Sequence, residues 1–157
     1  MSSERARAWA RALALAGFVV ALDQITKQIA ISSVSPGEPV DILFGVEITN
    51  VRNKGVAFGL LSGGNAPVLA ITLGVLAVLL LYFAVATPRP GLWEATGLLV
   101  GGALGNLADR VRADAVIDFI DPPLWPAFNL ADVAIIAGVA LLAFVVTSPI
   151  GADAASP

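Results

Sequence analysis

The feature that most constrains this chain is the uncharged, apolar run from Ala66 to Ala86. An apolar helix of about 20 residues is long enough to cross the hydrocarbon core of a bilayer. Three further apolar blocks cover residues 12–31, 92–107 and 128–146. With 57% hydrophobic and only 13% charged residues, the chain is also more apolar than a soluble domain. We therefore predict a single integral membrane domain, residues 1–157, with an all-α core of four transmembrane helices.

The segment between the first two predicted helices has a different character. Its start, Ser35-Pro36-Gly37-Glu38-Pro39, is typical of a turn. Residues 42–51 are rich in β-branched side chains, which favours short strands. We predict a small extracytoplasmic β-rich lobe, about residues 36–62, between helices one and two. Its apolar side chains allow it to lie on the membrane surface or to cover a site there.

Four spans place both ends of the chain on the same side of the membrane. Cytoplasmic segments favour Lys and Arg, and the segments before the first span and between the second and third contain Arg5, Arg7, Arg11 and Arg89. This predicts cytoplasmic termini, with the lobe and residues 110–127 on the outer side. The bias is moderate, because the outer side also carries Arg52, Lys54, Arg110 and Arg112.

The chain contains neither cysteine nor histidine. This excludes disulfides, thiol nucleophiles, Ser-His-Asp catalysis, and zinc sites built on imidazole or thiolate. Any acid–base or nucleophilic chemistry must use Asp, Glu, Lys, Tyr, Ser or Thr. We expect no metal ion and no cofactor. The sequence has no basic cluster that suggests a nucleic acid, so membrane lipid is the expected surrounding.

Two carboxylates accompany the start of the last predicted span. Asp132 falls in the first turn of that helix, and Asp118 precedes it by a proline-containing link. Adjacent carboxylates share a proton, so one can take a proton from water while the other polarises a peptide carbonyl. We hypothesise an aspartyl protease pair. In the structural alternative, Asp132 interacts with the helix macrodipole and Asp118 is a solvated loop residue.

Several other polar residues lie within the predicted spans or at their ends. Asp23 and Lys27 are spaced to pair on one helix face, and a structural role is at least as good an interpretation as catalysis. Asn106 and Asn129 can orient a substrate or a carboxylate, or they can cap helices.

Two more motifs are open to both interpretations. Asp109 and Arg110 end the third span, and a structural ion pair is the default, although Arg110 can also hold a carboxylate. Asn53 and Gly55 belong to a glycine-containing stretch after the predicted strands. The glycines allow a turn close to a ligand, but an ordinary hairpin end is the better interpretation.

The residues alone leave two other functions open. A proton-coupled transporter would use Asp23, Asp118 and Asp132 as relay acids, but it predicts acids near the middle of spans, whereas the key acids here lie near span ends. A non-enzymatic assembly protein would use the glycine-rich third span for packing. It predicts that Asp118→Asn is harmless.

Five segments taken together resemble the lipoprotein signal peptidase family of bacterial aspartic peptidases. In chain order they are DQITK (23–27), NKGVAFG (53–59), GGALGNLADR (101–110), VIDFI (116–120) and FNLAD (128–132). Each motif is weak alone. Five in this order, on four predicted spans, extend over nearly the whole chain and make a specific signal.

The resemblance implies an intramembrane aspartic endopeptidase of the bacterial inner membrane. It would remove the signal peptide from diacylglyceryl-modified prolipoproteins by cleaving just before the lipidated cysteine. Globomycin-type peptides would inhibit it, and we expect a monomer. The catalytic pair falls on Asp118 and Asp132. Substrate-binding or supporting roles fall on Asp23, Lys27, Asn53, Gly55, Asn106, Arg110 and Asn129.

Overall fold

The computed structural model describes residues 3–54 and 65–148. These residues contain the long helices α1 (Ser3–Ser33), α2 (Asn65–Val85), α3 (Leu92–Ala113) and α4 (Leu130–Thr147). Three of them, α1, α2 from Ala66 onward, and α4, are long and apolar enough to cross a membrane. The chain is therefore a multi-pass membrane protein.

The bounds of the helices differ from those predicted. Helix α1 begins at Ser3 instead of residue 12 and has 31 residues, more than a bilayer core requires. Helix α3 continues past the predicted end at residue 107 to Ala113. Helix α4 begins at Leu130 because Asn129 is its N-cap. In each case polar residues extend or end a helix whose apolar part the sequence had identified.

Helix α3 is the central helix, because it contacts α1, α4 and α2. Its glycines allow the close approach. A Cβ on Gly101 would lie 2.7 Å from Cβ of Val19 in α1, and one on Gly102 would lie 2.5 Å from the carbonyl oxygen of Ala131 in α4. The glycine-rich part of α3 thus packs closely against two neighbouring helices. With four charged residues, Glu94, Asp109, Arg110 and Arg112, α3 is not among the helices whose composition marks them as spans.

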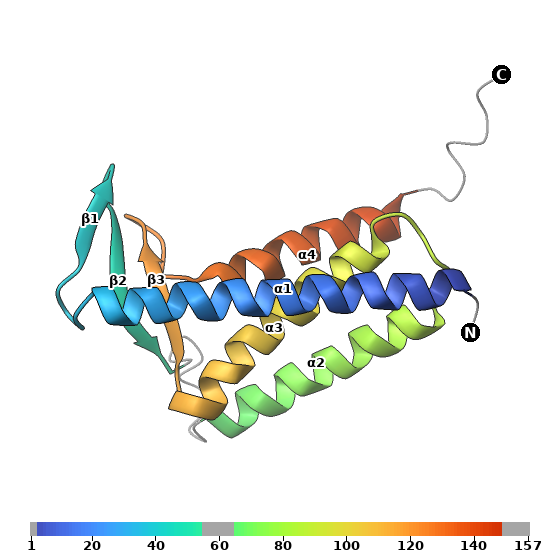
Figure 1. Ribbon diagram of the computed structural model, residues 1–157, viewed down its shortest axis with the longest axis horizontal. Coiled ribbons are helices and arrows are strands. Elements are labelled where there is room, and N and C mark those ends of the chain that lie inside the picture. Colours follow the sequence, from blue (N-terminus) through green and yellow to red (C-terminus); the bar gives the residue numbers. More distant parts are fainter. Residues whose placement is uncertain (1–2, 55–64, 149–157) are drawn as a thin grey trace.

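A three-stranded antiparallel sheet lies across one end of the helices (Figure 1). Its strands are β1 (Val40–Leu43), β2 (Val46–Asn53) and β3 (Val116–Asp121), in the order β1-β2-β3. The sequence prediction placed the lobe wholly between helices one and two, and this was incomplete, because β3 comes from the link between α3 and α4. The correction matters for the site, since β3 carries Asp118, opposite Val51 of β2.

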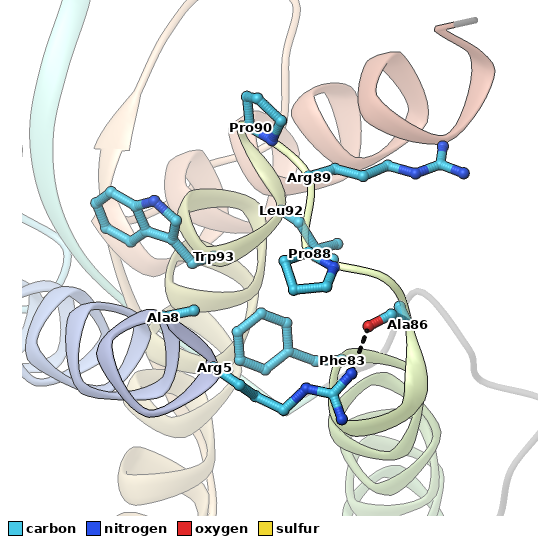
Figure 2. A pocket seen from close by; sticks show the side chains of 9 residues that line it. All are labelled: Arg5, Ala8, Phe83, Ala86, Pro88, Arg89, Pro90, Leu92 and Trp93. Carbon is cyan, nitrogen blue, oxygen red and sulfur yellow. Dashed lines mark hydrogen bonds between the residues drawn. The ribbon is translucent and has the colours of Figure 1, made fainter. Parts of the chain in front are cut away.

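Aromatic and basic side chains close the opposite end of the bundle. Trp9 of α1 packs edge-on against Phe83 of α2, with ring centroids 4.7 Å apart. Arg5 donates a hydrogen bond to the carbonyl oxygen of Ala86 at the end of α2, beside a pocket of about 240 Å³ (Figure 2). Trp and Arg suit the boundary between hydrocarbon and water. This end is thus held together by contacts typical of a membrane interface.

Candidate active site

The polar residues singled out in the sequence converge at the sheet end of the bundle. Strand β3 supplies Asp118 and the first turn of α4 supplies Asp132. Helices α3 and α1 supply Asn106 and Lys27. Asn129, which directly precedes α4, contacts both aspartates. Three consecutive elements, α3, β3 and α4, therefore build one site together with the distant helix α1.

Asp118 is a buried strand residue, only 2% exposed. Its Oδ2 accepts a hydrogen bond from the side-chain amide of Asn53 on β2 at 2.9 Å. Its Oδ1 accepts one from the amide of Asn129 at 2.6 Å. The structural alternative, in which Asp118 is a solvated loop residue, is therefore wrong.

Asp132 and Asn129 form a capping box at the start of α4. The backbone N–H of Asp132 donates to Oδ1 of Asn129 at 3.0 Å, and Oδ2 of Asp132 accepts from the backbone N–H of Asn129 at 3.2 Å. The other oxygen, Oδ1, accepts from the side-chain amide of Asn106 at 2.8 Å. Both interpretations of Asn129 hold, since it caps a helix and also orients a carboxylate.

The electrostatics of Asp118 suit a carboxyl group that retains a proton. Burial is the largest influence and raises its pKa above the usual range, and the charge of Asp132 acts in the same direction. The hydrogen bonds from Asn53 and Asn129, and the charge of Lys27, oppose this rise. The net direction is upward, as expected for one member of a pair that shares a proton.

A buried ionic network lies next to the two aspartates. The ammonium of Lys27, 2% exposed, lies 2.9 Å from Oδ2 of Asp23 and 2.7 Å from Oδ2 of Asp109. The predicted pairing of Asp23 with Lys27 is confirmed. Asp109 pairs with Lys27 instead of its neighbour Arg110, which donates to the carbonyl oxygen of Asn106 at 3.3 Å.

Two members of this network, Gln24 and Asp109, were not predicted from the sequence as partners of Asp23 and Lys27. The side-chain amide of Gln24 donates to Asp109 at 2.8 Å and also to Asp23 at 3.2 Å. The sequence predicted Arg110 as the partner of Asp109, whereas the structure pairs Asp109 with Lys27. The available signal was the polar stretch 23–27 inside an apolar run, because so many buried polar groups need partners from another helix.

A groove of about 640 Å³ runs between α2, α3 and α4 and leads toward the site. Its lining is mainly aliphatic, and it includes the polar side chains of Asn106 and Arg110. Since Asn106 donates to Asp132, the groove reaches a side chain that contacts one of the two carboxylates. Gly55, the remaining predicted site residue, lies outside the described residues.

The described part of the chain contains no cluster of side chains suited to bind a metal ion. Within residues 3–54 and 65–148, no group of three or more acidic side chains is arranged to hold a metal ion. Two neighbouring carboxyl groups can exchange protons with a reactant.

The chain is similar in sequence to known proteins. Residues 15–148 match the family model described as signal peptidase (SPase) II. A protein named lipoprotein signal peptidase from Moorella thermoacetica is 38% identical over 147 residues, covering 92% of this chain and 98% of that protein. Another of the same name, from Halothermothrix orenii, is 40% identical over 125 residues, covering 79% of this chain and 86% of that one.

Two solved structures are also similar to this chain. Both are described as bacterial membrane enzyme structures. One has a TM-score of 0.81 and 34% identity, covering 87% of this chain and 92% of that one. The other has a TM-score of 0.78 and 35% identity, covering 86% of each chain. The similarity thus includes both the sequence and the fold.

Proposed function

This chain belongs to the signal peptidase II family, and we propose that it removes signal peptides from prolipoproteins with Asp118 and Asp132 as its catalytic pair. The protein is a protease and a multi-pass membrane protein. The observation that carries the catalytic assignment is the position of Asn129. It donates to Asp118 with its side chain and binds Asp132 through a capping box, so the two carboxyl groups form one constellation.

The proposed reaction uses one protonated and one ionised carboxyl group. Asp132 takes a proton from water, and the water oxygen bonds to the carbonyl carbon of the scissile peptide. At the same time Asp118 gives its proton to the carbonyl oxygen, which yields a tetrahedral diol. Asp132 then gives its proton to the amide nitrogen as the C–N bond breaks. The diol returns a proton to Asp118, and both groups regain their starting states.

The groove between α2, α3 and α4 is the proposed track of the substrate. A signal peptide carries an apolar segment of about 7–15 residues, and a diacylglyceryl group adds hydrocarbon. Aliphatic lining suits both, while Asn106 and Arg110 offer polar contacts to the peptide near the scissile bond. Cleavage just before the lipidated cysteine follows in this scheme, because the lipid remains in the membrane beside the carboxyl pair.

Four transmembrane helices remain part of the proposal. Helix α3 has 22 residues, which is about 33 Å at 1.5 Å per residue. Neighbours on several sides shield it from lipid, which explains how it tolerates polar residues. With Arg5, Arg7, Arg11 and Arg89 at the cytoplasmic end, the sheet and the site face the outer side of the inner membrane. The proposed enzyme is a monomer and a target of globomycin-type peptides.

Cleavage of a diacylglyceryl-modified prolipoprotein by the purified chain in lipid nanodiscs tests the proposal. We expect Asp118→Asn and Asp132→Asn each to reduce kcat about 1,000-fold or more, and globomycin to abolish wild-type turnover. The matched control is Asp41→Asn, an exposed carboxylate on β1, which should behave as wild type. Normal turnover by either catalytic variant would reject the pair, and turnover of unlipidated substrate at the same rate would reject the lipidated-cysteine specificity.

A further inference from the structure

Lys27 is a buried cation with a partner for each of its three N–H donors. A lysine ammonium has three N–H donors and no acceptor. Its three partners are the carboxylates of Asp23 and Asp109 and Oδ1 of Asn106, at 2.9, 2.7 and 3.0 Å. The lysine therefore connects two positions of α1 to two positions of α3 at one point. Because Asn106 donates its amide to Asp132, the third contact already reaches one catalytic residue.

Each of the two carboxylates also holds the backbone just before one catalytic aspartate. Oδ1 of Asp23 accepts from the backbone N–H of Ala131, which precedes Asp132, at 2.9 Å. Oδ2 of Asp109 accepts from the backbone N–H of Ile117, which precedes Asp118, at 3.2 Å. The segments that carry the two catalytic side chains are thus tied to two carboxylates, and both carboxylates are tied to Lys27.

We propose that Asp23 and Asp109 are positioning residues that, through the Lys27 they share, set the separation of Asp118 and Asp132. Lys27, Asp23 and Asp109 are called the clamp here. The clamp acts through backbone and side-chain contacts and does not touch the substrate. The inference rests on the proposed catalytic pair.

Three features favour this role over simple ion pairing. The clamp residues are almost completely buried, with exposures of 0% for Asp23, 2% for Lys27 and 6% for Asp109. Burying three charges is costly and is a weak way to gain stability. The partners of the two carboxylates are also placed one residue before each catalytic aspartate, where a shift of the backbone moves the carboxyl group directly. A misplacement of about 1 Å in such a site costs about 100-fold in rate.

The test compares variants that leave a buried cation paired with at least one carboxylate but alter the contacts around it. Asp109→Asn keeps an acceptor for the N–H of Ile117, whereas Asp109→Leu removes it and leaves Lys27 paired with Asp23. Lys27→Arg keeps the charge on a longer, planar group. We measure kcat, KM and the midpoint of thermal unfolding with lipidated substrate in nanodiscs. Gln28→Met, an exposed neighbour of Lys27, is the control with expected wild-type values.

We expect Asp109→Leu to lower kcat about 100-fold and Lys27→Arg to lower it about tenfold or more, with KM changed less than about threefold. Asp109→Asn should retain more kcat than Asp109→Leu. Equal kcat for the Asn and Leu variants, or wild-type kcat for Lys27→Arg, would overturn the clamp. A fall in kcat that only follows the fraction of folded protein would also overturn the clamp. If Asp109→Leu does not fold, the kcat of Lys27→Arg decides the question.

Asp118→Asn in the same assay separates this inference from the proposed function. If the wild type fails to cleave, or if Asp118→Asn cleaves normally, the catalytic assignment itself is wrong. If the wild type cleaves, Asp118→Asn does not, and the clamp variants keep wild-type kcat, then only the clamp is wrong.

Discussion

The side-chain amide of Asn129 donates to Oδ1 of Asp118 across 2.6 Å. This contact joins strand β3 to the N-cap residue of helix α4, and Asn129 is completely buried. The amide end that donates and the carbonyl end that caps α4 belong to one short side chain. The orientation of one of the two proposed catalytic carboxyl groups is thus coupled to the helix that carries the other.

Asn129→Ser separates these two tasks. Serine is a good N-cap and keeps an acceptor for the N–H of Asp132, but it is too short to reach Asp118. We expect the free energy of unfolding to fall by about 1–3 kcal/mol, because a buried acceptor loses its donor. We expect kcat to fall about 100-fold. Asn129→Ala, which loses both contacts, should lose further stability; if the Ser and Ala variants are equally stable, the capping box contributes nothing.

The raised pKa of Asp118 predicts an alkaline limit to activity. Burial is its main cause and the charge of Asp132 adds to it. Since the proposed reaction needs a proton on Asp118, kcat should fall as the pH rises through that pKa. Asn53→Ala removes a hydrogen bond that lowers the pKa, so the alkaline limb of the kcat profile should move to higher pH. An unmoved limb, or one moved to lower pH, would contradict the assignment of the proton to Asp118.

The same shift has a consequence for stability. The folded-state pKa of Asp118 lies above its unfolded value, so the native state binds more protons between the two values. The free energy of unfolding should therefore fall as the pH rises through this interval and should stay level, as far as this group is concerned, above it. Thermal unfolding midpoints of the wild type and of Asp118→Asn across this range check the sign, because the variant should lack this component of the fall.

A methyl group at Gly105 should disturb the clamp. A Cβ there would lie 2.6 Å from Oδ2 of Asp23, and that oxygen is held by Lys27. We expect Gly105→Ala to lower the free energy of unfolding by about 1–3 kcal/mol and to lower kcat as well. Gly17→Ala, in open space on α1, is the control. Gly17→Ala should not lower the free energy of unfolding, because alanine is the better helix former by about 1 kcal/mol.

The sequence allowed the membrane helices to be predicted but not the complete site. Helix α2 is recognisable because its apolar run is long and unbroken. The pair of Asp23 and Lys27 follows from helical spacing alone. Strand β3 was missed because its six residues contain no alternation of apolar and polar side chains; it is buried from Val116 to Phe119. The short stretch therefore resembled a link.

The clamp shows why the rest could not be predicted. The contact between Lys27 and Asp109 joins α1 to α3 across 82 positions of sequence, and no local spacing encodes it. The sequence does show that partners are required, because a lysine and two acids within apolar helices are costly to bury unpaired. Which partners they find depends on how the glycines of α3 let the helices approach.

The groove between α2, α3 and α4 gives the last prediction. Ala103 of α3 lies in its lining, beside Leu76 and Leu79 of α2. Ala103→Phe should fill part of the groove while leaving both aspartates and their donors unchanged. If the apolar part of the substrate lies there, KM should rise about tenfold with kcat nearly constant, because uniform binding is lost and not transition-state stabilisation. Leu104→Phe, on the exposed side of the same helix, should leave KM unchanged. Equal KM for both variants and the wild type would place the substrate elsewhere.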